Sequence, residues 1–188
     1  MELSVNSLLL RYKTIASRFE QTVQRPVQIA MIERIENNNL WKKFVTELEY
    51  KNEKPPFSVL EEGGKANAML LFHGTTSTDP SIIIDSHEGL DYRFNGKNAT
   101  MLGKGVYFHK NASYSDGYAY KKGTHKIMIV AKVLVGQTTT VQSDSQRTVP
   151  PLLEGSDRAR YDTINGGDGR YVVFTNAKSY PAYLITYN

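Results

Sequence analysis

The sequence predicts an α+β fold in one domain, and two kinds of pattern support this prediction. In the amino-terminal part, apolar residues at helical spacing form one face of an amphipathic helix, namely Leu8, Tyr12, Ile15 and Phe19. Farther along the chain, short apolar runs bounded by glycine or turn residues are typical of strands. A length of 188 residues suits a single domain, 1–188, with a sizeable core.

We expect residues 1–50 to be a helix-strand-helix part of this domain, because such a unit is too small to hold a core of its own. The first helix is predicted over residues 7–21. A strand with a bulge follows over residues 27–35, where the apolar alternation changes phase. The asparagines at 37–39 offer an N-cap for a second helix, whose apolar stripe begins at Leu40.

The rest of the chain alternates predicted strands with short helices and loops. Asp79–Pro80 is a helix-start signal, and the long polar loop of residues 91–104 is expected to be functional or mobile. Lys126–Val135 is almost continuously apolar and predicts a central strand. The β-rich runs Tyr171–Phe174 and Ala182–Tyr187 are separated by a short connection and predict a hairpin-like pair.

Two stretches combine apolar and polar residues as binding sites do. Residues 70–76, LLFHGTT, predict a buried strand that ends in hydrogen-bonding groups. This strand forms either the floor of a cleft or a core element whose histidine is satisfied internally. Residues 111–120, NASYSDGYAY, predict a short helix in which Tyr114 and Tyr118 either lie in the core or form a stacking site for a planar ligand with an amide.

Composition and motif spacing exclude several classes of site. The chain has no cysteine, which excludes disulfides, thiolate zinc sites and a cysteine nucleophile within it and fits a reducing compartment. Its four histidines lack the spacing of a zinc-binding helix, and there is no G-x-S-x-G elbow for a Ser-His-Asp hydrolase. We also expect no signal peptide, no membrane span and an intracellular location, cytoplasmic or nuclear.

The net charge of +4 comes from lysines that are spread along the chain. Basic residues gather only in pairs such as Lys42–Lys43 and Lys121–Lys122. We therefore expect a solvated surface, with a weak affinity for nucleic acid or another polyanion as the alternative.

Six motifs, in fixed order, resemble the catalytic domain of the poly(ADP-ribose) polymerase (PARP) family of ADP-ribosyltransferases: LLFHGTT, GKGVYF, ASYSDGY, YDTI, YVVF and YPAYLITY. The resemblance extends upstream through IERIENNNLW and covers the chain from about Tyr12 onward. It is closest to the mono-ADP-ribosylating branch with macrodomains, through GLDYRFNGKNATMLGKGVYF. It implies a diphtheria-toxin-like fold, in which two packed, mainly antiparallel sheets flanked by short helices form an NAD⁺ cleft, without the regulatory helical domain of the DNA-activated members.

The resemblance also implies that the chain binds NAD⁺ as a co-substrate and requires no metal. His73 matches the histidine that holds the adenine-side ribose hydroxyls, and Thr75 stands where a hydroxyl residue contacts the same ribose. Gly74 matches the glycine whose backbone pairs with the nicotinamide amide. Residues from Gly89 through Lys97 resemble the donor loop that closes over the co-substrate.

Three further residues match the nicotinamide pocket of the family. Tyr107 is similar to the tyrosine under the nicotinamide ring. Ser115 matches the serine that bonds the amide, and Tyr118 matches the tyrosine that covers the other face of the ring. Two aromatic planes and an amide clamp would hold nicotinamide so that its glycosidic bond can ionise.

The family triad is His-Tyr-Glu, so His73 and Tyr107 match it, whereas Arg170 stands in place of the glutamate. That glutamate bonds the ribose 2′-hydroxyl and activates an elongating acceptor. The resemblance therefore implies transfer of one ADP-ribose without polymer elongation. An inward guanidinium would oppose a developing positive sugar at ~4 Å by roughly a few kcal/mol.

Three alternatives follow for Arg170: it turns outward, it pairs with an acidic or phosphorylated acceptor, or it leaves a domain that binds NAD⁺ or ADP-ribose without turnover. Asp168 is a candidate substitute carboxylate if the strand extends that far. The expected acceptor is a protein side chain or the chain itself, and a terminal phosphate of nucleic acid is a further alternative. We expect a monomer, or a fragment of a larger multidomain protein, with no membrane partner.

Overall fold

The computed structural model describes residues 5–52, 68–94 and 101–188, so residues 95–97 of the predicted donor loop lie outside it. None of the helices in these ranges is both long and apolar enough to cross a membrane. In chain order the elements are α1 (Val5–Val23), β1 (Ile29–Arg34), α2 (Asn38–Asn52), β2 (Ala68–His73), α3 (Pro80–Asp85), η1 (Tyr92–Phe94), β3 (Val106–His109), α4 (Ala112–Asp116), β4 (Tyr120–Lys122), β5 (His125–Leu134), β6 (Thr138–Thr139), β7 (Thr163–Asn165), β8 (Arg170–Val173), η2 (Asn176–Lys178) and β9 (Ser179–Tyr187).

The amino-terminal elements form as the sequence predicts. Helix α1 buries Phe19 completely, although Tyr12, which its periodicity places on the same face, is 44% exposed. Strand β1 pairs with β9, and its register shifts between Ile29 and Met31, so the strand has a bulge, but this bulge precedes the change of phase at Ile32 that predicted it. Asn37 is the N-cap of α2, because its Oδ1 accepts hydrogen bonds of 3.1 Å from two backbone N–H groups of the first turn.

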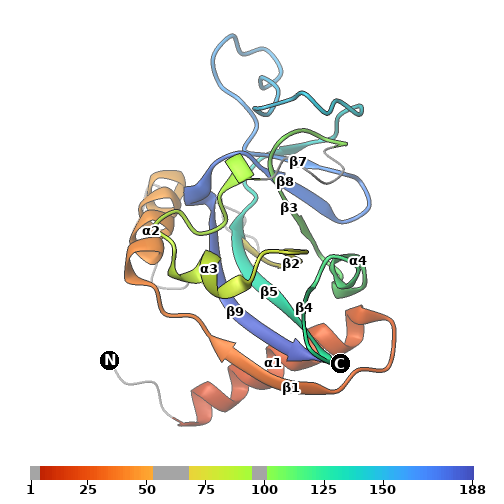
Figure 1. The fold of residues 1–188 in the computed structure, drawn as a ribbon. Helices are drawn as coiled ribbons and strands as arrows, with labels where there is room; N and C mark the ends of the chain where they lie inside the picture. The colour runs from red at the N-terminus through yellow and green to blue at the C-terminus, as the bar shows by residue number, and fades with distance from the viewer. Residues whose placement is uncertain (1–4, 53–67, 95–100) are drawn as a thin grey trace.

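Within the described residues, the strands form one nine-stranded sheet in the order β1-β9-β5-β2-β3-β8-β7-β6, with β4 also paired to β5. Strand β5 lies between β9 and β2, which confirms Lys126–Val135 as a central strand. The pairs are antiparallel except for the short pair of β6 with β7. Figure 1 shows α2 beside the sheet and α1 crossing behind its lower half.

The predicted hairpin-like pair at the carboxyl end is wrong. Strand β8 pairs with β3 and β7, whereas β9 pairs with β1 and β5. The runs Tyr171–Phe174 and Ala182–Tyr187 therefore belong to different halves of the sheet, and η2 leads from one half to the other. The nine-residue β9 has a partner on each side, which satisfies more of its backbone groups than a short hairpin would.

The two packed sheets that were predicted are halves of one hydrogen-bonded sheet. Strands β2 and β3 are joined by a single registered pair, Phe72 with His109. Side chains of β2, β5 and β9 meet those of β3 and β8 in one buried cluster, which includes Leu71, Phe108 and Val173. The two halves therefore pack against each other across a shared core, although their strands belong to one hydrogen-bonded sheet. The mixed α+β class is confirmed.

Helix α1 covers the opposite face of β2, β5 and β9 through a second buried cluster. At its centre the ring of Phe19 meets Phe72 of β2 edge-on, with ring centroids 6.1 Å apart. It also meets Tyr187 of β9, with ring centroids 4.7 Å apart. This contact holds α1 against the strand that leads to His73.

We predict that Phe19→Ala lowers the free energy of unfolding by about 3–5 kcal/mol, because it leaves a cavity between Phe72 and Tyr187. Tyr12→Ala on the same helix is the matched control and should cost about 0.5 kcal/mol or less, since this side chain is exposed. Urea denaturation followed by circular dichroism measures both. Equal losses in the two variants would contradict this description of the core.

Candidate functional site

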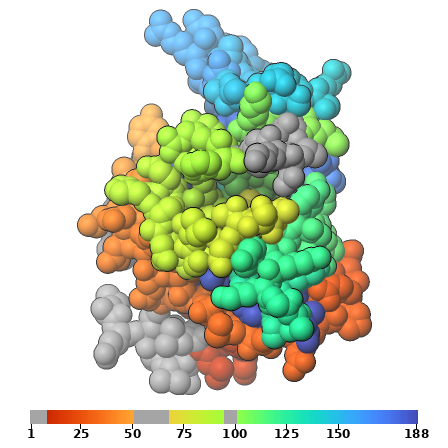
Figure 2. All heavy atoms as spheres, in the orientation of Figure 1, coloured from red at the N-terminus to blue at the C-terminus, as the bar shows by residue number. Residues whose placement is uncertain are grey.

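The turn after β2 lies against α4 through a close backbone contact at Gly74. A Cβ atom at this position would lie 2.5 Å from the carbonyl oxygen of Tyr118 and 2.7 Å from that of Ser115, so only glycine fits. The N–H of Thr76 donates a hydrogen bond of 2.6 Å to the same Tyr118 oxygen. Figure 2 shows the yellow residues after β2 beside the green residues of α4. The turn and the end of α4 thus form one unit.

Polar groups of this unit are suited to a planar amide. None of the hydrogen bonds described for the turn uses the backbone N–H or C=O of Gly74. Ser115 is buried, and its hydroxyl donates to the carbonyl of Phe72 at 3.2 Å, from which it can rotate toward a ligand. The Thr75 hydroxyl donates to the carbonyl of Thr78 at 2.6 Å, which leaves its lone pairs as acceptors.

His73, the last residue of β2, is half-buried, and one hydrogen bond orients its ring. Its Nδ1 lies 2.8 Å from the carbonyl oxygen of Tyr107. Since a carbonyl only accepts, Nδ1 carries the proton, and Nε2 of the neutral ring is an acceptor. Burial lowers the pKa of His73, although the hydrogen bond to Tyr107 opposes this effect. At pH 7 the neutral ring can therefore accept a hydrogen bond from a ligand hydroxyl.

Tyr107 lies on the face of β3 and β8 that points away from the shared core, because it alternates with Val106 and Phe108. Its hydroxyl donates to the carbonyl of Gly103 at 2.8 Å and accepts from the N–H of Leu102 at 2.9 Å. Burial raises the pKa of Tyr107, so the phenol is neutral. Both hydrogen bonds fix the plane of the ring.

The rings of His109, Tyr114 and Tyr118 form a row of neighbouring aromatic side chains. His109 and Tyr114 are stacked, with centroids 4.5 Å apart and an interplanar angle of 10°. Tyr114 and Tyr118 are 5.9 Å apart and tilted by 35°. Tyr114 is 37% and Tyr118 is 41% exposed, so the alternative that places both tyrosines in the core is wrong. The ring of Tyr118 is thus accessible and lies beside that of Tyr114.

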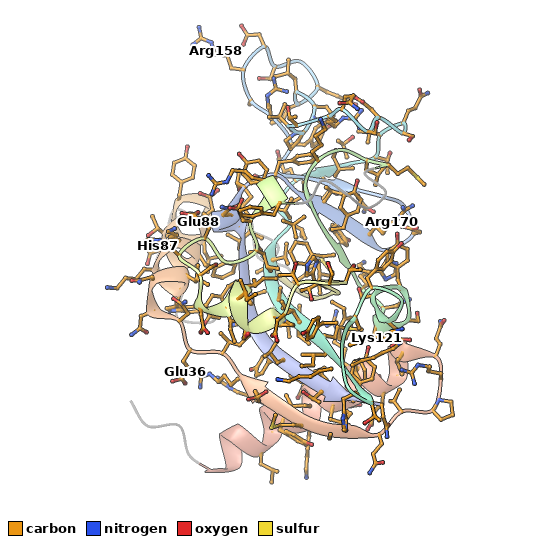
Figure 3. The ribbon with its side chains drawn as sticks, viewed as in Figure 1. Glu36, His87, Glu88, Lys121, Arg158 and Arg170 are labelled. Carbon is orange, nitrogen blue, oxygen red and sulfur yellow. The ribbon has the colours of Figure 1, made fainter. Side chains whose placement is uncertain are left out.

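Arg170, the first residue of β8, is paired and largely enclosed. Its Nε lies 2.8 Å from Oδ2 of Asp168, and its side chain is 16% exposed. The guanidinium lies 5.7 Å from the centroid of the Tyr114 ring. The hydrogen bond to Asp168 raises the pKa of Arg170, so it stays charged. Figure 3 shows Arg170 at the edge of the sheet, above α4. Arg170 therefore does not turn outward.

Asp168 does not stand where a substitute carboxylate was expected. Strand β8 begins at Arg170, and Gly169 before it has a φ of +100°, so the strand alternation does not reach Asp168. Its Oδ1 also accepts a hydrogen bond of 3.1 Å from the backbone N–H of Arg170. The carboxylate of Asp168 thus orients Arg170 and neutralises part of its charge.

Gly89 lies apart from these residues in the described structure. Its φ is +66°, its N–H donates to Oγ of Ser86 at 2.8 Å, and a Cβ atom there would meet the side chain of Leu40 at 3.1 Å. These contacts account for a glycine at this position through the packing of the turn against α2. The role of residues 89–97 as a donor loop stays a prediction.

Asp116, at the end of α4, was not identified by any sequence pattern. Its carboxylate binds Nη2 of Arg25 at 3.0 Å, Nζ of Lys126 at 3.0 Å and the hydroxyl of Tyr187 at 2.8 Å. Although burial raises it, these donors lower the pKa of Asp116 to about 2. The partners come from the α1–β1 connection, β5 and β9, so no local signal in the sequence could reveal this contact.

The structure therefore brings together His73, Gly74, Tyr107, Ser115 and Tyr118 through direct contacts. Together they offer backbone N–H and C=O groups, exposed aromatic surface and an acceptor for a hydroxyl group. Such a set suits a planar ring that carries an amide and is linked to a sugar. Among the residues that the structure describes, no group of three His, Cys, Asp or Glu side chains is placed to hold a metal ion.

Comparison with known proteins shows which family the chain resembles. A model of the poly(ADP-ribose) polymerase catalytic domain matches residues 11–152. A "Probable poly [ADP-ribose] polymerase" of Dictyostelium discoideum is 32% identical over 98% of this chain and 52% of its own length. Two relatives are named protein mono-ADP-ribosyltransferase. PARP12 of Mus musculus is 34% identical over 85% of this chain and 22% of its own length.

PARP14 of Homo sapiens is 32% identical over 94% of this chain and 10% of its own length. The chain thus spans about half the length of the Dictyostelium relative and less than a quarter of the length of the other two. The names of these two relatives support the mono-ADP-ribosylating branch.

We predict that Asp116→Asn lowers the free energy of unfolding at pH 7 by about 2 kcal/mol, because it removes the charge that binds Arg25 and Lys126. The pKa of Asp116 is depressed in the folded state to about 2. The stabilisation is therefore fully present above the unfolded pKa of about 3.9 and is lost as the pH falls from about 4 toward 2. Urea denaturation across this range measures the difference between parent and variant.

The matched control for this series is Asp157→Asn, which changes an exposed carboxylate of a surface loop. Its effect at pH 7 should stay within about 0.5 kcal/mol. A difference between parent and Asp116→Asn that does not shrink on acidification would show that the carboxylate is not the stabilising group.

Proposed function

Because the chain belongs to the family of poly(ADP-ribose) polymerase catalytic domains, we propose that it is a mono-ADP-ribosyltransferase. It would cleave NAD⁺ at the nicotinamide–ribose bond and transfer one ADP-ribose to a protein acceptor. The close packing of Gly74 against Ser115 and Tyr118 is the observation that carries this proposal. It leaves a backbone donor and acceptor next to a serine hydroxyl and an exposed aromatic ring, which is what a nicotinamide group needs.

Binding of NAD⁺ in this proposal uses the groups described above. The amide of nicotinamide pairs with the backbone of Gly74 and the hydroxyl of Ser115, and the ring lies between Tyr107 and Tyr118. Each aromatic contact of this kind adds about 0.5–1.5 kcal/mol beyond area burial. Nε2 of His73 accepts a hydrogen bond from an adenine-side ribose hydroxyl, since Nδ1 is held by the carbonyl of Tyr107. Thr75 lies in the same turn.

The reaction breaks the bond between C1′ of the ribose and the ring nitrogen of nicotinamide. The bonding electron pair leaves with nicotinamide, which becomes neutral, and positive charge develops on the sugar. An acceptor oxygen or nitrogen then bonds to C1′ and loses its proton. Clamping the ring and the sugar in fixed orientations lowers the barrier by removing rotational freedom. The ion pair with Asp168 weakens the repulsion that Arg170 would exert on the sugar.

Transfer of a single ADP-ribose follows from the groups on the face of Tyr107. Polymer elongation requires an acceptor group that binds the ribose 2′-hydroxyl and draws off its proton. Arg170 at this place only donates, and Asp168 is engaged by Arg170. The names of PARP12 and PARP14 also support mono-transfer. We propose an intracellular protein acceptor or the chain itself.

A binding module without turnover is the second candidate, and the specific observation that favours it is that Arg170 replaces the family glutamate while Asp168 is engaged by Arg170. Both candidates predict NAD⁺ affinity, so catalysis decides between them. Transfer to a terminal phosphate of nucleic acid is a third possibility for the acceptor, which Arg170 and the net charge of +4 would assist.

We expect the purified chain to release nicotinamide from labelled NAD⁺ and to acquire label in increments of one ADP-ribose by mass spectrometry. His73→Ala should weaken NAD⁺ binding about tenfold, as expected for one lost hydrogen bond of about 1.4 kcal/mol. Arg170→Glu places the family glutamate at this position and tests whether the chain then adds several ADP-ribose units. Lys121→Met, at an exposed position of β4, is the matched control.

The outcomes separate the candidates. Nicotinamide release at background level together with measurable NAD⁺ affinity would leave the binding module. Label transferred to an added 5′-phosphorylated RNA, in preference to protein, would identify a nucleic-acid acceptor. Chains of several ADP-ribose units made by the parent would refute the assignment of mono-transfer.

A second prediction concerns the amide clamp. We expect Gly74→Ala to weaken NAD⁺ binding by at least tenfold, because its Cβ atom would displace the backbone of α4. Gly117→Ala is the matched control: a Cβ atom there meets no atom within 4 Å, and its backbone is helical, so NAD⁺ affinity should be retained. Isothermal titration calorimetry measures both. Equal affinities would place the amide elsewhere.

A further inference from the structure

A cavity of about 490 Å³ lies between α1 and the strands β2, β5 and β9. It faces α1, on the opposite side of the sheet from the proposed NAD⁺ site, because Leu70 in its wall and His73 alternate on β2. Its volume falls in the range of small-molecule sites. Apolar side chains contribute much of its lining, with Leu10, Ile15, Ala68, Leu70 and Tyr183 among them.

Lys132 places a charged group in this apolar space. It lies on the central strand β5, in register with Leu70 of β2 and Tyr180 of β9. Its Nζ lies 5.1 Å from the ring centroid of Trp41, and no ion-pair partner exists for it among the described residues. Burial lowers the pKa of Lys132 to about 8, and the nearby charge of Arg11 adds to this effect.

Two arginines of α1 approach the same cavity. Nη2 of Arg18 donates a hydrogen bond of 2.7 Å to the carbonyl of Leu70. Arg11 also lines the cavity, and it has no ion-pair partner in the described ranges. No Asp or Glu belongs to the described lining of the cavity. Lys132 and Arg11 thus approach an apolar space without an ion-pair partner among the described residues, which is unfavourable, and a bound anion would offset this cost.

We propose that this cavity binds an amphipathic monocarboxylate of the medium-chain fatty-acid class. The carboxylate lies between Lys132 and Arg11 and accepts charge-assisted hydrogen bonds from both. Arg18 donates to the carbonyl of Leu70, so the proposed head-group contacts are those of Lys132 and Arg11 alone. The alkyl chain lies along the apolar wall, where each buried methylene adds to the affinity. This site is independent of the proposed NAD⁺ site.

The single tryptophan of the chain makes the site measurable. Trp41 lies next to Lys132, so its fluorescence reports an anion that binds the ammonium group. Dodecanoate, kept below its micelle concentration, should bind saturably with one molecule per chain, as followed by Trp41 fluorescence and by calorimetry. Dodecanol, which lacks the charge, and acetate, which lacks the chain, should each bind at least tenfold more weakly.

Lys132→Met tests the head-group contact, because methionine keeps an unbranched apolar side chain and removes the charge. We expect at least a tenfold loss of dodecanoate affinity by calorimetry and, without ligand, a higher melting temperature than that of the parent. Lys121→Met, an exposed change on β4, should keep the affinity of the parent. Arg11→Met on α1 is a second variant and should also weaken dodecanoate binding.

Three results would overturn the proposal. The first is the absence of saturable dodecanoate binding. The second is equal affinity for dodecanol, or unchanged dodecanoate affinity in both Lys132→Met and Arg11→Met, which would mean that only an apolar surface is present. The third is binding of acetate as tight as that of dodecanoate, which would indicate an adventitious ion only.

Discussion

The carboxylate of Asp116 is the interaction on which the arrangement of the site depends. It binds Arg25, Lys126 and Tyr187 at once, so the short helix α4 is anchored to the α1–β1 connection and to two strands of the sheet. A helix of five residues has little stability of its own, and its position must come from such tertiary contacts. The pKa of Asp116 is depressed because these donors favour the charged form more than burial disfavours it.

Because α4 is anchored, the backbone that follows it is held close to the turn after β2. Gly74 makes this approach sterically possible, and the hydrogen bond from Thr76 to Tyr118 joins the two segments. The proposed nicotinamide pocket is therefore preorganised by backbone contacts, which lose little freedom when a ligand binds. A backbone group also orients His73, whose Nδ1 bonds the carbonyl of Tyr107. The end of β2 with its turn therefore contacts both β3 and the segment at the end of α4.

Local periodicity predicted the helices and strands well, because capping at Asn37 and the apolar face of α1 are encoded by neighbouring residues. The family model that matches residues 11–152 confirms the family inferred from ordered motifs. Strand pairing could not be predicted in the same way. Strands β8 and β9 are consecutive strands of the chain, yet β8 pairs with β3 and β7, whereas β9 pairs with β1 and β5. The contact of Arg170 with Tyr114 could not be predicted either, because the two residues are far apart in the sequence and meet only in the folded chain.

The environment of Arg170 bears on which acceptor the site would favour. In the family pattern a carboxylate at this place would stabilise a positive sugar, whereas here Asp168 and Arg170 form a pair with little net charge. The remaining stabilisation must then come from the phosphates of NAD⁺ and from the acceptor itself. In the proposed reaction a negatively charged acceptor would supply part of this stabilisation, because it attracts the developing sugar cation. For the proposed transferase, we therefore expect an acidic or phosphorylated acceptor to be electrostatically favoured over a neutral one.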